Sequence, residues 1–323
     1  MKTRILWMVV LLLSISIASV AVAQNAAVTH DTWSSGAPMP RALVSSAAAV
    51  FGKYIVVVGG AYGWSNVAIA DTRIYDPASN TWRRGPSLPT PISGAAAAVA
   101  NGLFYVIGGG DRNMYTNAVW AYDLQTRTWS SKSPMPTARG NFVAVVEKNI
   151  IYAIGGFNGS TTVNNVESYN PATDTWTEET PLPAGVLGLA AGLMKGWIVA
   201  ADGNEGACGG CDYGQTQIYS PSSNAWYGGS SDPTPRDWVC GGSIDGQLYV
   251  ASGYPADGYA GGESYTLTES FNAKSNTWAT LADIPQGTIG AASAVYNGQL
   301  YCFGGAPSYP GGAALNNVQI YQP

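Results

Sequence analysis

The residue types that most often carry out chemistry are scarce in this chain. Among 323 residues there are one histidine, His30, and four cysteines. A single imidazole excludes every site that needs two histidines, whether for metal binding or for catalysis. His30 also lies in a strand region near the start of the chain, so we expect no Ser-His-Asp or Cys-His arrangement. The sequence therefore predicts neither a metal site nor a cofactor.

The cysteines fall into two groups with different expected roles. Cys208 and Cys211 lie in a glycine-rich loop with the sequence Ala-Cys-Gly-Gly-Cys-Asp, where a disulfide is expected in an oxidising compartment. A redox-active pair needs a lowered thiol pKa and zinc needs two further ligands, and the neighbouring sequence supplies neither. Cys302 lies within a strand-like run and Cys240 at the start of another. We expect buried free thiols at both, although Cys240 could reach the loop of Cys208.

Three arginines follow prolines at points that the sequence suggests are equivalent, namely Arg41, Arg139 and Arg236. The planar guanidinium matches carboxylates, so one interpretation is that these side chains hold an acidic ligand. The other, which we favour, is structural: the arginines bond backbone carbonyls between neighbouring units of the fold.

A further set of aromatic, acidic and basic side chains stands outside the regular pattern of the chain. Its members are Tyr62, Trp64, Asp111, Arg112, Tyr115, Phe157, Tyr213, Trp238, Tyr254 and Tyr309. Flat rings interleaved with polar groups suit sugars, whose C–H faces stack while their hydroxyls form hydrogen bonds. They equally suit a peptide or a protein, because Tyr and Trp are enriched at interfaces. The alternative is that these rings only pack within their own loops.

The elements that must position these residues repeat along the chain with a period of 47 to 52 residues. Each unit has a tryptophan, and most units have a glycine pair. From the second tryptophan onward, a tyrosine or a phenylalanine comes shortly before the tryptophan. The tryptophans are Trp33, Trp82, Trp129, Trp176, Trp226 and Trp278. The glycine pairs are Gly59-Gly60, Gly108-Gly109, Gly155-Gly156 and Gly304-Gly305. A period of this length is typical of propeller repeats.

These residues resemble the Kelch repeat, and the resemblance covers essentially all of residues 24–323 in six copies. It implies an all-β fold, a single six-bladed β-propeller with four-stranded antiparallel blades. The residues agree, because each unit holds four strand-like runs. In the first unit these are Val44–Phe51, Tyr54–Val58, Thr72–Tyr75 and Thr81–Arg83. We expect the N-terminal strand at Thr29–Trp33 to close the last blade.

The first 23 residues are typical of a signal peptide. Lys2 and Arg4 precede an apolar stretch that ends in Ala-Val-Ala, with cleavage expected before Gln24. No later stretch is long and apolar enough to span a bilayer. We therefore expect a secreted or periplasmic protein with no membrane span after cleavage. The formal net charge of −5 argues against nucleic acid as a partner.

In such blades the loops after the glycine pairs and the loops between blades emerge on one face, here called the upper face. The unexplained aromatic residues and arginines belong to these loops. We expect a binding module rather than an enzyme, with a carbohydrate or an extended acidic polypeptide held on the upper face.

The resemblance also suggests alternatives. Kelch copper oxidases and the iron-binding specifier proteins need more histidine than His30 supplies. Periplasmic sialic acid mutarotases use a glutamate and an arginine across the upper pocket, roles that Glu205 and Arg139 could take. A sugar epimerase or mutarotase is therefore one alternative, and a non-catalytic structural surface scaffold is the other.

Overall fold

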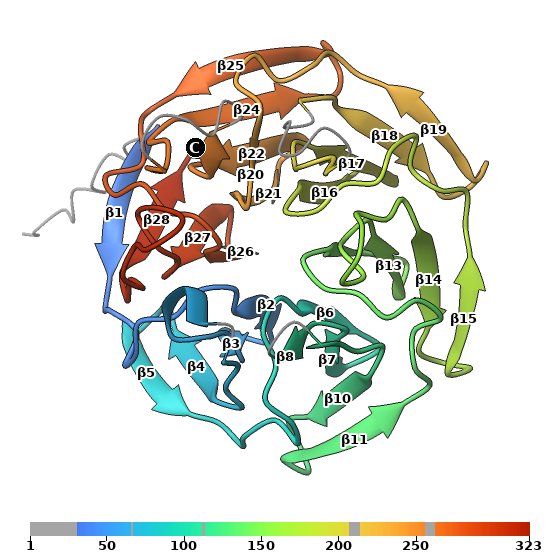
Figure 1. Ribbon diagram of the computed structural model, residues 1–323, viewed down its shortest axis with the longest axis vertical. Coiled ribbons are helices and arrows are strands. Elements are labelled where there is room, and N and C mark those ends of the chain that lie inside the picture. Colours follow the sequence, from blue (N-terminus) through green and yellow to red (C-terminus); the bar gives the residue numbers. More distant parts are fainter. Residues whose placement is uncertain (1–30, 66, 112–113, 207–213, 256–261) are drawn as a thin grey trace, which may run out of the picture.

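Six antiparallel sheets of four strands each are arranged around a central axis (Figure 1), where the innermost strands line a channel. They are seen in a computed structural model of the chain, which describes all residues except 1–30, 66, 112–113, 207–213 and 256–261. Within each sheet one strand lies at the channel and the others follow outward. This arrangement confirms the predicted all-β, six-bladed propeller.

Blades one to three follow the chain from the innermost strand outward. Blade one contains β2 (Ala47–Phe51), β3 (Tyr54–Val58), β4 (Thr72–Asp76) and β5 (Thr81–Arg84). Blade two contains β6 (Ala96–Ala100), β7 (Leu103–Ile107), β10 (Val119–Asp123) and β11 (Thr128–Lys132). Blade three contains β12 (Val143–Glu147), β13 (Ile150–Ile154), β14 (Val166–Asn170) and β15 (Thr175–Glu178). The four runs predicted for blade one are all present, although its first strand begins three residues later than expected.

Blades four and five repeat this order. Blade four contains β16 (Ala190–Met194), β17 (Trp197–Ala201), β18 (Gln217–Ser220) and β19 (Ala225–Gly228). Blade five contains β21 (Cys240–Ile244), β22 (Gln247–Ala251), β24 (Thr268–Asn272) and β25 (Thr277–Leu281). In the described parts of the upper loops the elements are short, and they are η1 (Gly63–Ser65), β8 (Gly110–Asp111), β9 (Met114–Tyr115), β20 (Arg236–Asp237) and β23 (Tyr254–Pro255).

The last blade is built from both ends of the described chain. Its strands are β26 (Ala292–Tyr296), β27 (Gln299–Phe303), β28 (Val318–Gln322) and β1 (Thr32–Gly36). β1 pairs antiparallel with β28, with Trp33 opposite Tyr321. The predicted closure is therefore confirmed, and it pairs two strand edges that would otherwise be open.

The repeated tryptophans join neighbouring blades. Each packs on the aromatic ring of the next strand inward, at centroid distances of 4.9 to 5.5 Å. Each indole N–H also donates to a backbone carbonyl on a neighbouring segment, as from Trp82 to Ala37 at 2.8 Å and from Trp176 to Ser133 at 2.9 Å. These rings are therefore part of the packing between blades.

A ring of backbone hydrogen bonds on the upper side shows which positions are equivalent. The second residue of each glycine pair, or its counterpart, donates its N–H to the next blade at 2.7 to 3.1 Å. The accepting carbonyls belong to Leu43, Ile92, Arg139, Val186, Arg236 and Thr288. Arg41 lies two residues before Leu43, so the prediction that it is equivalent to Arg139 and Arg236 is wrong.

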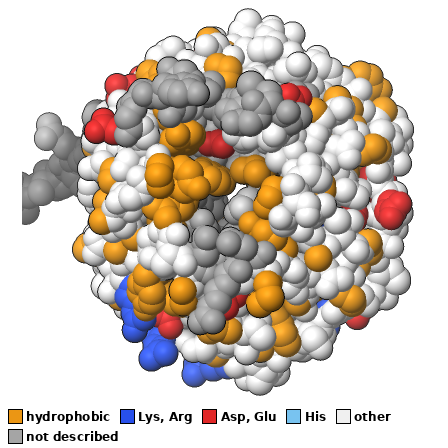
Figure 2. Space-filling model, viewed as in Figure 1, with side chains coloured by type: hydrophobic (Ala, Val, Ile, Leu, Met, Phe, Trp, Pro, Cys, Tyr) orange, Lys and Arg blue, Asp and Glu red, His pale blue; other side chains and the backbone are white. Residues whose placement is uncertain are grey.

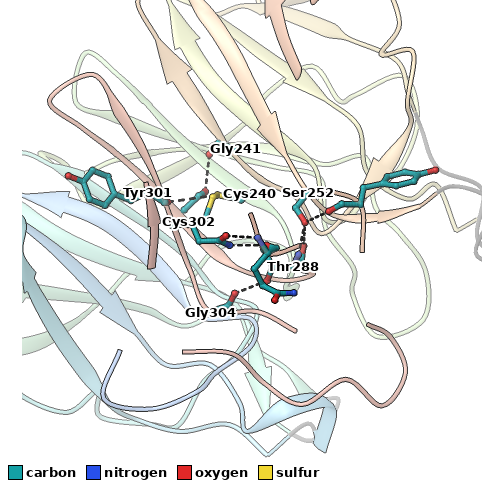
Figure 3. Close-up of a disulfide and its surroundings, with 11 residues drawn as sticks. Cys240, Gly241, Ser252, Thr288, Tyr301, Cys302 and Gly304 are labelled. Carbon is teal, nitrogen blue, oxygen red and sulfur yellow. Dashed lines mark hydrogen bonds between the residues drawn. A yellow bond between two sulfur atoms is a disulfide. The ribbon is translucent and has the colours of Figure 1, made fainter. Parts of the chain in front are cut away.

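A disulfide joins Cys240 at the start of β21 to Cys302 on β27, with their Cα atoms 5.9 Å apart (Figure 3). The expectation of free thiols at these positions is therefore wrong, and Cys240 is bonded to Cys302, whereas the loop of Cys208 lies outside the described residues. Cys240 lies on the innermost strand of blade five and Cys302 on the second strand of blade six. The bond thus links adjacent blades through a buried site.

Within the described part of the chain, no helix has both the length and the apolar character needed to cross a membrane.

Candidate functional site

The innermost strands leave a channel along the axis of the propeller. Its cavity has a volume of about 420 Å³ and is lined mostly by alanine, glycine, valine and serine. Six strands crowd around the axis, so small side chains are needed there. A second cavity of about 180 Å³ lies where the channel opens on the upper face. We call it the upper-mouth pocket.

Six residues surround the opening of the channel, each two positions before the first residue of an innermost strand, and four of them line the upper-mouth pocket. All have positive φ, between 47° and 68°, and they are Ser45, Gly94, Asn141, Gly188, Trp238 and Gly290. Five junctions between them carry an N–H···O=C hydrogen bond of 2.7 to 2.9 Å. At the sixth, the amide of Val239 lies 3.5 Å from the carbonyl of Gly188. This mouth belt fixes the backbone around the opening.

Trp238 is the exception in the mouth belt. Glycine, asparagine and serine occupy the five equivalent positions, and glycine and asparagine adopt positive φ readily. A bulky side chain in this conformation is strained by about 1–3 kcal/mol. At φ 47° Trp238 retains this strain, and its indole lines both the channel and the upper-mouth pocket.

Four of the predicted aromatic residues form a cluster at one side of the mouth. Trp64, from η1 of blade one, lies 5.5 Å from Trp238 and 4.7 Å from Tyr309 between ring centroids. Tyr309 lies 5.1 Å from Trp238 and 5.9 Å from Tyr254. The Trp64 indole N–H donates to the carbonyl of Ser308 at 3.0 Å, which fixes its ring. Figure 2 shows hydrophobic side chains gathered beside the central hollow.

Tyr115 and Phe157 form a second aromatic pair, with ring centroids 5.6 Å apart. The Tyr115 ring packs on the backbone of Gly140, where a Cβ atom would come within 2.7 Å of it. Burial raises the pKa of Tyr115, while a hydrogen bond with Asn141 opposes the shift. The phenol therefore stays protonated near neutral pH. Of this pair, Tyr115 lines the pocket and Phe157 supports it.

Two other predicted residues lie away from the pocket. Tyr62 is 47% exposed and its hydroxyl accepts a hydrogen bond from Arg41. Asp111 accepts a hydrogen bond from the backbone N–H of Ala68 at 2.9 Å, which joins the upper loops of blades one and two. Neither is among the residues that line the upper-mouth pocket.

Arg139 and Arg236 have no exposed surface. Arg139 pairs with Glu167, which is also buried, and donates to the carbonyl of Ala153 at 3.1 Å. Burial lowers the pKa of Arg139, and the charge of Glu167 opposes this shift. Arg236 pairs with Glu269 at 2.7 Å. Their assignment as ligand-binding residues is corrected, because side chains enclosed within a blade cannot reach a ligand at the mouth.

The proposed catalytic pair of Glu205 and Arg139 is not brought together at the pocket. Glu205 is half-buried, and its backbone carbonyl accepts a hydrogen bond from the hydroxyl of Thr162. Neither residue lines the channel or the upper-mouth pocket. In the described residues, no group of three or more His, Cys, Asp or Glu side chains is arranged to hold a metal ion.

Comparison with known protein families agrees with the geometry of the blades. A family model described as the KLHDC2/KLHL20/DRC7 Kelch-repeats domain matches residues 19–136 and 87–253, most of the chain. This chain belongs to the Kelch-repeat family. Kelch domains are protein-binding modules, so membership suggests a binding module and does not identify the ligand.

Individual relatives are more distant. Kelch-like protein 23 from Pongo abelii and from Homo sapiens are each 27% identical over 126 residues, which is 39% of this chain. The match spans only 21% of the length of these relatives. The solved structure titled "Structure of YjhT" has a TM-score of 0.75 and 18% identity, covering 87% of this chain and 95% of that one. At this identity the likeness shows the fold alone.

Some predicted residues of this Kelch chain lie outside the described residues. These are Arg112, Tyr213, Cys208 and Cys211, so the predicted disulfide of the last two stays a prediction. Ser45, Ser93 and Asn141 also line the upper-mouth pocket and were not predicted from the sequence. An alignment of the Kelch units at the residues before each innermost strand would have placed Ser45 and Asn141 beside Trp238.

Proposed function

We propose that this Kelch propeller is a binding module whose upper-mouth pocket holds an uncharged polar ring, with a carbohydrate as the favoured ligand class. The observation that carries the proposal is the strained backbone of Trp238. Strain of this kind is kept at functional sites when the surrounding structure enforces it. Here it places an indole at a position where the other blades have small side chains.

The chemistry of the pocket supports a sugar over an acidic peptide. Aromatic side chains line it together with Ser45, Ser93 and Asn141, and no charged residue is among its described lining residues. Aromatic faces can stack on the C–H face of a pyranose, and hydroxyl and amide groups can bond its hydroxyls. Arg139 and Arg236, which would have favoured an acidic ligand, are enclosed. The described lining also contains no carboxylate, so the epimerase alternative gains no support.

The experiment is a glycan array with residues 24–323, followed by titration of the best ligand. We expect Trp64→Ala and Trp238→Gly to abolish binding. The matched control is Trp197→Ala, because Trp197 is 41% exposed and does not line the pocket. A protein that binds no glycan and is unaffected by the pocket variants would leave the structural scaffold as the better hypothesis.

We also propose that the protein is exported. The Cys240–Cys302 disulfide supports this, since such bonds persist in oxidising compartments. The N-terminal segment predicted to direct export lies outside the described residues. Mass spectrometry of protein recovered from the periplasm or medium tests the proposal, and the expected mature N-terminus is Gln24.

A further inference from the structure

Three guanidinium groups meet one carboxylate on blade one. Arg73 on β4 has a side chain only 6% exposed and makes the closest contact with Asp71. Nη1 of Arg41 lies 3.6 Å from Oδ2 of the same carboxylate, and Nη2 of Arg84 lies 3.9 Å from Oδ1. The side chains of Arg41 and Arg84 are 51% and 78% exposed. We call Arg41, Arg73 and Arg84 the blade-one arginine cluster.

The packing of the blades does not require this cluster. In blade three the position equivalent to Arg73 is Glu167, which pairs with one buried arginine. Blade five repeats this arrangement with Glu269 and Arg236. Blade one has Leu43 in place of the buried arginine and carries Arg73 in place of the glutamate. A structural ion pair explains one arginine beside Asp71, and two exposed arginines remain unexplained.

The charges in the cluster do not balance. Three positive groups surround one negative group in a chain whose formal net charge is −5. Desolvation is the main reason that the pKa of Arg73 is lowered, and repulsion from Arg41 and Arg84 adds to it, while Asp71 opposes the shift. Figure 2 shows Lys and Arg side chains gathered at one edge of this view, on the side of blade one. An anion placed between the exposed guanidiniums would relieve this repulsion.

We propose that the blade-one arginine cluster binds an oxyanion, either the carboxylate or the phosphate-type group of a ligand. Arg41 and Arg84 present planar donors that match oxyanion geometry. The hydroxyl of Tyr62 accepts a hydrogen bond from Arg41, which leaves its own proton to donate to the anion. The three arginines do not line the upper-mouth pocket, so the site is separate from the proposed carbohydrate site.

The test is calorimetric titration of residues 24–323 with inorganic phosphate and, separately, with acetate at constant ionic strength. We expect saturable binding of at least one anion, and the tighter of the two identifies the class of group. Arg84→Gln and Arg41→Gln should each weaken it about tenfold, as expected for loss of a charge-assisted hydrogen bond. Both side chains are exposed, so these variants should fold.

Arg83→Gln is the matched control. Arg83 is adjacent to Arg84 on β5, and because neighbouring strand residues point to opposite faces it lies instead over the Tyr54 ring, 4.8 Å from its centroid. The substitution Arg83→Gln removes one positive charge from the same strand as Arg84→Gln does, and it should leave anion binding unchanged. Absence of saturable binding by both anions would overturn the proposal, as would equal weakening by Arg83→Gln and Arg84→Gln. Trp238→Gly should leave anion binding intact, which separates this test from that of the pocket.

Discussion

The indole rings of Trp64 and Trp238 lie 5.5 Å apart although they belong to blades one and five, which are not neighbours. Tyr309 of blade six packs against both, at 4.7 and 5.1 Å. The repeated tryptophans, by contrast, each join adjacent blades at the periphery. The three rings at the mouth come together because blade six lies between blades one and five in the closed ring.

Replacing Trp238 with glycine should remove binding at a small cost in stability. Glycine adopts φ 47° without strain, so relief of about 1–3 kcal/mol offsets much of the lost aromatic contact. We expect the free energy of unfolding to change by less than about 2 kcal/mol. Trp129→Ala, which removes a ring that packs between blades, should lower it by about 3–5 kcal/mol. Urea denaturation measures both.

Equal loss of stability in Trp238→Gly and Trp129→Ala would contradict a functional role for the strained backbone of Trp238. If Trp238→Gly unfolds at as low a urea concentration as Trp129→Ala, the indole of Trp238 is packing and its strain has no functional explanation.

The fold could be predicted because its signal is repeated. One Trp and one glycine pair are weak evidence, but six tryptophans at a nearly constant spacing identify the blade and its packing rings. The missing outer strand of the last unit likewise predicted the closure by β1. These features are local in sequence, or follow directly from the period.

The errors concern contacts between blades, which the period does not encode. Cys240 and Cys302 are 62 residues apart and lie on different strands of their blades, so their pairing depends on how two sheets pack. Arg41 seemed equivalent to Arg139 because both follow a proline, and only the hydrogen bonds between blades revealed the shift of two residues. The aromatic set was partly correct: Trp64, Trp238, Tyr254 and Tyr309 do gather, whereas Tyr62 lies away from the pocket.

The disulfide should contribute strongly to stability. It closes a loop across a sequence separation of 62 residues, which limits the entropy of the unfolded chain by about 4 kcal/mol. We expect Cys240→Ala/Cys302→Ala to lower the free energy of unfolding by about 2–4 kcal/mol and to leave carbohydrate binding intact once folded. The double variant avoids a reductant, which would also act on the other cysteines. Equal urea midpoints for the two proteins would contradict this account.

The buried ion pair of Arg139 and Glu167 should affect the stability of the fold and should have no part in ligand binding. Arg139→Ala leaves a buried carboxylate without its partner and should destabilise the protein by about 3–5 kcal/mol. The double variant Arg139→Met/Glu167→Leu removes both charges and should recover much of that loss. Thermal unfolding of the two variants provides the comparison. If the double variant is as unstable as Arg139→Ala, the loss does not come from the unpaired carboxylate of Glu167.

Asp202 occupies a position where blade three has Gly155, and it is 1% exposed. Neither of its carboxyl oxygens has a hydrogen-bond partner among the described residues. Burial raises the pKa of Asp202 well above its usual range, the charge of Asp232 adds to the shift, and Arg236 opposes it. The folded protein therefore keeps the proton on Asp202 to a higher pH than the unfolded chain does.

The sign of the pH dependence follows from this difference. The pKa of Asp202 is higher in the folded protein than in the unfolded chain. Its contribution to the free energy of unfolding is therefore fully present below about pH 4 and is lost as the pH rises through the folded pKa. Asp202→Asn keeps the size and shape of the side chain but removes the group that titrates, and asparagine tolerates the φ of 63°. We expect this variant to be more stable than the original by about 1–3 kcal/mol at pH 7, with a smaller difference at pH 4. Some pH dependence should remain, because burial also raises the pKa of Glu269 in the same cluster. Urea denaturation at a series of pH values tests the assignment, and a stability difference that does not change with pH would show that Asp202 is not the titrating group.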